Sequence, residues 1–138
     1  MDRQEELRLR RLEQLEHLSP QEILYELERF RSYEWIDDQQ VERKARHHLK
    51  AWKHFHASGK QLTVAELREI ARSVKEKSDR IFTCLDPKAV DNITWIFIEG
   101  NVVVACRTGY IQTCFPVKDL GLYLTHLWSW IDSRELLP

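Results

Sequence analysis

Between residues 93 and 116 the apolar residues come in short unbroken runs, a pattern that predicts β-strands. Three runs rich in β-branched and aromatic side chains lie in this segment: residues 93–98, 102–106 and 110–115. Polar segments that contain Gly100 and Gly109 separate the runs, and glycine readily takes the positive φ angles of tight turns. The segment therefore predicts an antiparallel meander, with residues 80–85 as a candidate fourth strand.

On both sides of the meander, apolar residues recur every three or four positions, which predicts helices. The expected helices cover residues 2–17, a segment after Ser19, residues 38–55, a segment after Thr63, and residues 117–131. Ser19 and Thr63 each begin a capping box, because a glutamate follows three residues later. The helix over 38–55 has an apolar stripe: Val41, Ala45, Leu49 or His48, Trp52 and Phe55. The fold class predicted is α+β, with N-terminal helices, a small three- to four-stranded antiparallel sheet and a C-terminal helix.

A chain of 138 residues is long enough for one domain with a sizeable core. We expect residues 1–40 to form a helical arm or docking segment and residues 41–138 to form the α+β domain. The charged N-terminus is not a secretory signal, and no apolar run is long enough to cross a membrane. The three cysteines, Cys84, Cys106 and Cys114, have no metal-ligand spacing, and their odd number argues against a complete disulfide framework. The sequence thus predicts a cytoplasmic protein.

The net charge of −1 conceals an uneven distribution of charge along the chain. Residues 1–42 hold twelve Asp or Glu against six Arg, whereas residues 43–60 hold six Arg or Lys and no acid. Four of the six histidines also lie in this basic segment. The segment predicts an anionic partner. A solvated helix face paired with the acidic N-terminal half explains the charges nearly as well.

The sequence does not predict a metal or another cofactor. Neighbouring histidines such as His47 and His48 point in different directions on a helix, and residues 43–60 hold no carboxylate to complete a ligand set. A phosphate-binding glycine-rich loop, a nucleophile elbow and a Rossmann fingerprint are all missing from the sequence.

Cleavage of RNA by its own 2′-hydroxyl requires a proton acceptor, a proton donor and groups that stabilise the charged phosphorane. The basic segment offers histidines and cations, and the strand ends offer Arg107, Thr108 and Thr113. Thr113 alternates with Ile111 and Phe115, so we expect it on their apolar face, where its hydroxyl needs a partner. The alternative explanation is a strand-forming threonine bonded to a neighbour.

Short motifs occur in order along residues 47–123. Lys53 and His54 are followed by Thr63 at a helix start. The later motifs are Gly109, Ile111-Gln112-Thr113-Cys114-Phe115-Pro116 and Gly121-Leu122-Tyr123. Together these motifs resemble those of bacterial toxin ribonucleases of the barnase–EndoU–colicin–RelE superfamily, metal-independent enzymes that place helices before a curved antiparallel sheet. Two features differ: Lys50 stands where those toxins often carry a histidine, and the proline directly follows the phenylalanine.

The resemblance implies that His54 is a general acid or base, that Lys53 contacts phosphate and that Thr113 donates to the transition state. Arg107 joins them as a catalytic cation. The predicted RNA-binding residues are Arg43, His47, Lys50, Lys60, Thr108 and Tyr123. The function predicted is a metal-independent RNA endonuclease of the toxin type, which cleaves through a 2′,3′-cyclic phosphate.

The predicted partners are RNA, an antitoxin or immunity protein, and a second copy bound through the N-terminal or C-terminal helix, with no membrane. Two other functions remain open at this point. One is a non-catalytic nucleic-acid-binding or regulatory adaptor, and the other is a protein-interaction oligomer.

Overall fold

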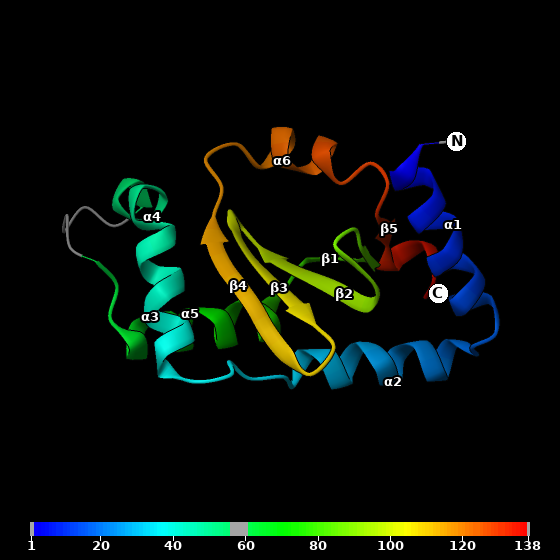
Figure 1. Cartoon of the computed structure of the whole chain (residues 1–138), viewed down its shortest axis with the longest axis horizontal. Coiled ribbons are helices and arrows are strands. Elements are labelled where there is room, and N and C mark those ends of the chain that lie inside the picture. Colours follow the sequence, from blue (N-terminus) through cyan, green and yellow to red (C-terminus); the bar gives the residue numbers. More distant parts are fainter. Residues whose placement is uncertain (1, 56–60, 138) are drawn as a thin grey trace.

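The computed structural model describes residues 2–55 and 61–137, which form helices around one antiparallel sheet (Figure 1). The helices are α1 (Arg3–Glu16), α2 (Pro20–Arg31), α3 (Asp38–His47), α4 (Leu49–Phe55), α5 (Val64–Lys77) and α6 (Leu120–His126). The strands are β1 (Arg80–Asp86), β2 (Ala89–Glu99), β3 (Val102–Arg107), β4 (Tyr110–Pro116) and β5 (Ile131–Asp132), and a short 3-10 helix covers Ser133–Glu135. The sheet order is β4-β3-β2-β1-β5. The α+β prediction is confirmed.

The predicted meander is present as β2, β3 and β4, and the candidate fourth strand is β1. Gly100 and Gly109 have φ angles of 55° and 99°, which lie in the left-handed region that favours glycine. The predicted capping boxes are also present, because the side chains of Ser19 and Thr63 accept from the N–H groups of Glu22 and Glu66.

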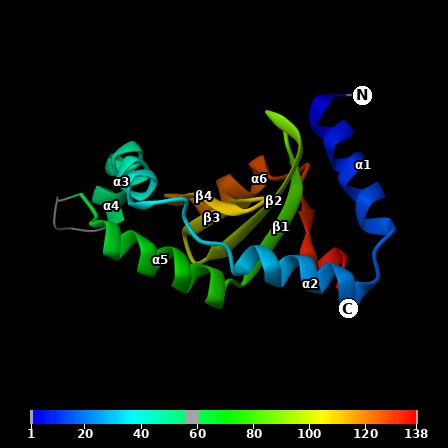
Figure 2. The same cartoon turned by 60° about the horizontal axis from the view of Figure 1, so that its bottom comes forward.

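The two faces of the sheet are covered by different helices. The face that we call the α5 face packs against α2, α3 and α5, and α6 lies on the other side, the α6 face (Figure 2). Buried side chains on the α5 face are Trp95, Phe97, Val104, Cys106 and Cys114. Buried side chains on the α6 face are Phe82, Ile96, Ile98, Val103 and Ala105. Since no residue of α6 is itself buried, this helix covers its face incompletely.

Helix α1 packs along β1 and contributes a buried charge to the interior. The Arg11 side chain is 1% exposed, its Nη2 lies 2.6 Å from Glu26 Oε2, and its Nε donates to Thr83 Oγ1 at 3.1 Å. Leu15 and Phe30 belong to the same apolar cluster as Trp95. Residues of the first 40, for which the sequence predicted an arm, therefore pack into the same core as the sheet.

The predicted C-terminal helix over residues 117–131 is wrong in its extent. Helix α6 ends at His126, and β5 then pairs with β1, with Thr83 opposite Ile131 and Phe82 opposite Asp132. The backbone groups at the edge of β1 find partners in this way, which a helix could not provide. Trp128, which lies between α6 and β5, is 52% exposed. In the described ranges no helix combines the length and hydropathy needed to cross a membrane.

Candidate functional site

A β-bulge in β4 decides which face the predicted site residue Thr113 occupies. Thr113 pairs with Ala105, but Ile111 pairs with Cys106, so Gln112 is an extra residue in the strand. The prediction that Ile111 and Thr113 share a face is therefore wrong. Ile111 belongs to the cluster of the α5 face, while Thr113 lies beside Ala105 on the α6 face.

The predicted helix over residues 38–55 is broken at His48. Helix α3 ends at His47 and α4 begins at Leu49, while His48 has φ −103° and ψ 22°, outside the helical range. The His48 carbonyl still accepts from the Trp52 N–H at 3.0 Å, so α4 follows α3 directly. The junction lies next to β4, the edge strand of the sheet (Figure 1).

The His48 side chain meets Thr113 at this junction. His48 Nε2 lies 3.1 Å from Thr113 Oγ1, a hydrogen bond whose direction follows the tautomer of the ring. The ring also stacks on Phe115, with 5.1 Å between centroids, and Phe115 in turn meets the ring of Tyr123 from α6 edge-on at 5.9 Å. His48, rather than the predicted His54, is thus the partner of the threonine hydroxyl.

Burial, with smaller contributions from His47 and Lys44, lowers the pKa of His48 to about 4. The ring is therefore neutral near pH 7. Burial also lowers the pKa of Lys44, and the positive charges of Arg43 and Arg107 add to this effect. An anion near Lys44 would counteract these effects, because it stabilises the charged ammonium.

Arg107 is held in place by a buried carboxylate. Its Nη2 lies 2.5 Å from Asp86 Oδ2, and Asp86 Oδ1 accepts the Lys88 N–H at 2.8 Å. Asp86 is 4% exposed, and Arg107 Nε is buried without a hydrogen-bond partner. The guanidinium therefore has a fixed position, and Asp86 offsets part of its charge.

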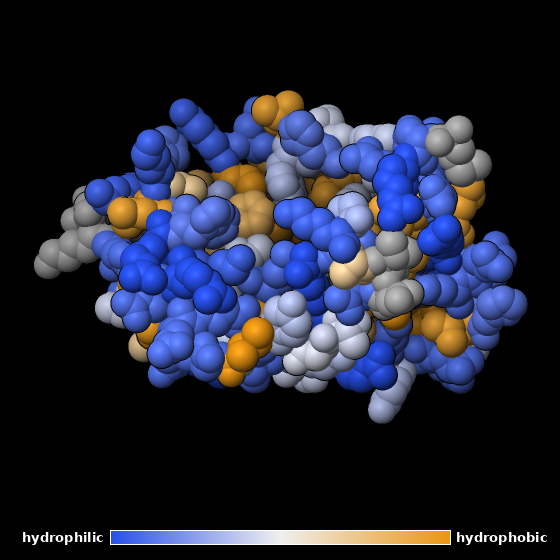
Figure 3. All heavy atoms as spheres, viewed as in Figure 1, coloured by the Kyte–Doolittle hydropathy of each residue, from blue (hydrophilic) through white to orange (hydrophobic). Residues whose placement is uncertain are grey.

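A pocket of about 230 Å³ opens beside Arg107, and we call it the Arg107 pocket. It is lined by Asp86, Pro87, Lys88, Thr94, Ile96, Ala105, Arg107, Gln112 and Trp130. Figure 3 shows this side of the molecule, where apolar atoms are recessed between hydrophilic ones below α6. Helix α6 contributes no residue to the lining of the Arg107 pocket, which combines the apolar Ile96, Ala105 and Trp130 with polar groups, as is typical of ligand sites.

Other predicted residues lie elsewhere. His54 and Lys50 line a separate pocket of about 300 Å³ with Ala51, Phe55, Pro116 and Lys118. Pro116 is the last residue of β4, so this pocket lies at the end of that strand. Arg43, Lys53 and Thr108 are exposed, and none of them is the hydrogen-bond partner that Thr113 has in His48. Lys60 lies outside the described residues.

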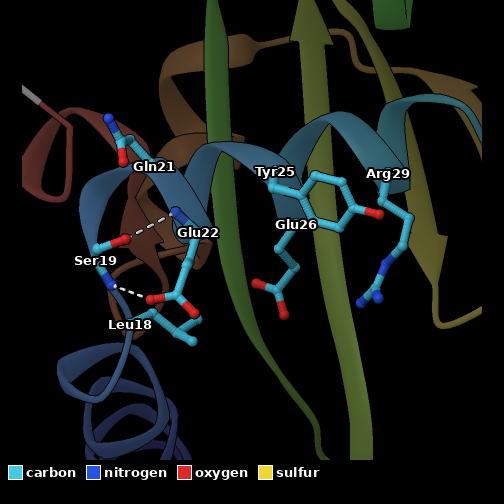
Figure 4. Close-up of a pocket in the computed structure, with 7 residues that line it drawn as sticks. All are labelled: Leu18, Ser19, Gln21, Glu22, Tyr25, Glu26 and Arg29. Atoms are coloured by element: carbon cyan, nitrogen blue, oxygen red, sulfur yellow. Dashed lines mark hydrogen bonds between the residues drawn. The ribbon is translucent and has the colours of Figure 1, made fainter.

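Another hollow lies over α2 and contains none of the predicted residues (Figure 4). Its polar groups serve the helix itself: Ser19 and Glu22 form the capping box, and Glu26 forms the ion pair with Arg11. We therefore assign the candidate site to the α6 face.

Sequence reasoning missed His48 and Lys44 as site residues. One signal was available, because His48 is an alternative member of the apolar stripe of residues 38–55 and follows Lys44 by one helical turn. In the described part of the chain, no three side chains among His, Cys, Asp and Glu come together as a metal site would require. Comparisons with family models, curated proteins and solved structures found no match.

Proposed function

We propose that the protein is a metal-independent RNA endonuclease that cleaves through a 2′,3′-cyclic phosphate. The observation that carries the proposal is the His48–Thr113 contact. Lys44 lies one helical turn before His48 and acts on its charge, and Arg107 lies two residues along β3 from Ala105, which pairs with Thr113. The resemblance of the β4 motif to toxin ribonucleases adds to it, with His48 in the role that the resemblance gave to His54.

The reaction assigns one role to each group. His48 Nε2 takes the proton of the 2′-hydroxyl, whose oxygen attacks phosphorus while the bond from phosphorus to the 5′-oxygen breaks. The departing 5′-oxygen takes a proton from His47, whose exposed ring is centred 4.7 Å from that of His48. Lys44 and the Thr113 hydroxyl stabilise the negative oxygens of the phosphorane.

The free site must rearrange slightly for this reaction, because His48 Nε2 is already hydrogen-bonded to the Thr113 hydroxyl. A bound phosphodiester attracts the threonine hydroxyl to one of its oxygens and leaves Nε2 open to the 2′-hydroxyl. Its negative charge also counteracts the cations that help to lower the pKa of His48. The base then becomes stronger when substrate is present.

Exposed basic residues next to the junction extend the site along an RNA strand. The exposed side chains are Arg43, Lys50, Lys53 and His54, of which Lys50 and His54 share a pocket with Lys118. The three free cysteines are buried and fit a reducing compartment, so the proposal places the reaction in the cytoplasm. A toxin of this kind requires an antitoxin or immunity protein, and the exposed Leu122 and Trp128 offer a surface for it or for a second copy.

The test uses total RNA with an excess of EDTA. Wild-type protein is expected to cleave it and to leave 2′,3′-cyclic phosphate ends, and His48→Ala to be slower by roughly 100- to 10,000-fold. His17→Ala, at the exposed end of α1, is the matched control and should retain full activity. Equal RNA integrity with wild type and His48→Ala would contradict the catalytic proposal.

A non-catalytic RNA-binding adaptor is the second candidate. Two contacts favour it: the hydrogen bond between His48 and Thr113, and the ion pair between Arg107 and Asp86. Both contacts engage side chains that catalysis would need to be free. The affinity of an adaptor for RNA would depend strongly on salt concentration, and the His48→Ala variant would bind RNA as tightly as the wild type.

A further inference from the structure

The Arg107 pocket adjoins the His48–Thr113 pair directly. Ala105 forms part of its lining and pairs with Thr113 across the sheet, and Gln112, which also lines it, precedes Thr113 in β4. If the phosphate of an RNA strand lies at His48, the base of one of the two nucleotides that it joins is therefore within reach of the pocket.

The volume and the lining of the Arg107 pocket suit an aromatic ring. Its volume of about 230 Å³ is small for a drug-sized ligand and sufficient for one nucleobase. Ile96, Ala105 and the indole of Trp130 provide apolar contact, and an aromatic side chain is a common stacking partner for a base.

The charge of the pocket favours a base over a second phosphate. Asp86 offsets the charge of Arg107 across 2.5 Å, and a carboxylate repels phosphate oxygens. Lys88 also lines the pocket, but its side chain is exposed to solvent, so the more buried charges of the lining are those of Asp86 and Arg107, which offset each other. Lys44, the cation assigned to the phosphate, does not line the pocket.

We propose that the Arg107 pocket binds the nucleobase next to the scissile phosphate and gives the enzyme a base preference. The identity of the ligand rests on the proposed function. Asp86 already accepts from Arg107 and from the Lys88 N–H, but each of its oxygens keeps a second lone pair that an N–H group of the ring can use. The Gln112 amide has no hydrogen-bond partner in the described part of the chain and is available to a polar group at the other edge of the ring.

The experiment measures binding of the four nucleoside 3′-monophosphates and of inorganic phosphate to the full-length protein by calorimetry. We expect at least one nucleotide to bind roughly 10-fold more tightly than inorganic phosphate, and the four bases to differ. Four nucleotides that bind equally, and no more tightly than inorganic phosphate, would overturn the inference.

Two variants test the pocket itself. Gln112→Ala and Thr94→Val are each expected to weaken the preferred nucleotide by about 3- to 10-fold and to leave the affinity for inorganic phosphate unchanged. Gln21→Ala, in the hollow over α2, is the matched control. We avoid changing Asp86, because its loss would leave Arg107 without its partner and destabilise the fold. A base preference that survives both pocket variants contradicts the assignment.

The outcomes separate this inference from the nuclease proposal. If binding depends on the base but RNA is not cleaved, the base-binding inference stands and the nuclease proposal is rejected. If RNA is cleaved but the four nucleotides and phosphate bind equally, the nuclease proposal stands and the base-binding inference is rejected.

Discussion

The two faces of the sheet differ in how completely helices cover them. On the α5 face, Phe97, Val104 and Cys114 are fully buried beneath α2, α3 and α5. On the α6 face, Phe115 and Thr113 remain partly exposed, and α6 buries none of its own residues. The closed face stabilises the fold, and the open face leaves the titratable His48 ring only partly buried.

Polar groups on the two sides are satisfied differently. On the closed side, Lys75 is 3% exposed and its ammonium donates to the Tyr33 carbonyl, while Arg11 is bonded to Glu26 and Thr83. These partners are fixed parts of the fold. On the open side, His48 has a hydroxyl partner that a ligand can replace, which is why we assign function there.

The largest expected effect comes from the same substitution made on each face. Phe97→Ala should lower the free energy of unfolding by about 3–5 kcal/mol, because Phe97 is fully buried on the α5 face. Phe115→Ala should cost less than half as much, since Phe115 is partly exposed. Urea unfolding monitored by circular dichroism measures both, and equal losses would show that the two faces do not differ.

The second effect concerns catalysis. Thr113→Val keeps the shape of the side chain but removes the hydroxyl that contacts His48, so RNA cleavage should slow roughly 100-fold. The unfolding free energy should change by only about 1 kcal/mol. Thr113→Ser restores the hydroxyl and should recover much of the rate. A Thr113→Val protein with full activity would remove Thr113 from the site.

The third effect is a dependence of stability on pH. His48 has a pKa of about 4 in the folded protein against about 6.5 unfolded, so the unfolded chain binds more protons between these values. The stability of the wild type should therefore fall as the pH drops from 6.5 to 4, by about 1–3 kcal/mol after allowance for solvent screening. His48→Gln lacks this contribution. Parallel urea titrations across the pH range compare the two proteins, and identical pH profiles would contradict the assigned pKa.

The smallest effect tests Lys44, the cation assigned to the phosphate. Lys44→Gln should weaken RNA binding by about 3- to 10-fold and reduce the slope of log affinity against log salt by roughly one unit. Lys77→Gln, exposed at the end of α5, should change neither value. Fluorescence anisotropy with a labelled oligonucleotide provides the measurement. Equal losses in the two variants would mean that binding is not localised at Lys44.

The sequence predicted the strands of the meander well, because β-branched runs and turn glycines are local signals that act within a few residues. It failed where one residue changes the register or direction of the chain. The bulge at Gln112 moves Thr113 to the other face from Ile111, and the break at His48 brings that ring to β4. Both depend on packing between distant segments.

The same limit explains the choice of histidine. The local motif Lys53-His54 pointed to His54, but the contact with Thr113 comes from His48, which is separated from it by 65 positions in the chain. The strand β5 was missed for a similar reason, since two residues pair with an edge that the local pattern does not show.

The most direct test of the central claim compares the two histidines on a DNA oligonucleotide that contains a single ribose, in EDTA. The account predicts that wild type and His54→Ala cut only at the ribose and leave a 2′,3′-cyclic phosphate, while His48→Ala is slower by at least about 100-fold. Cleavage that is lost in His54→Ala and kept in His48→Ala would contradict the account.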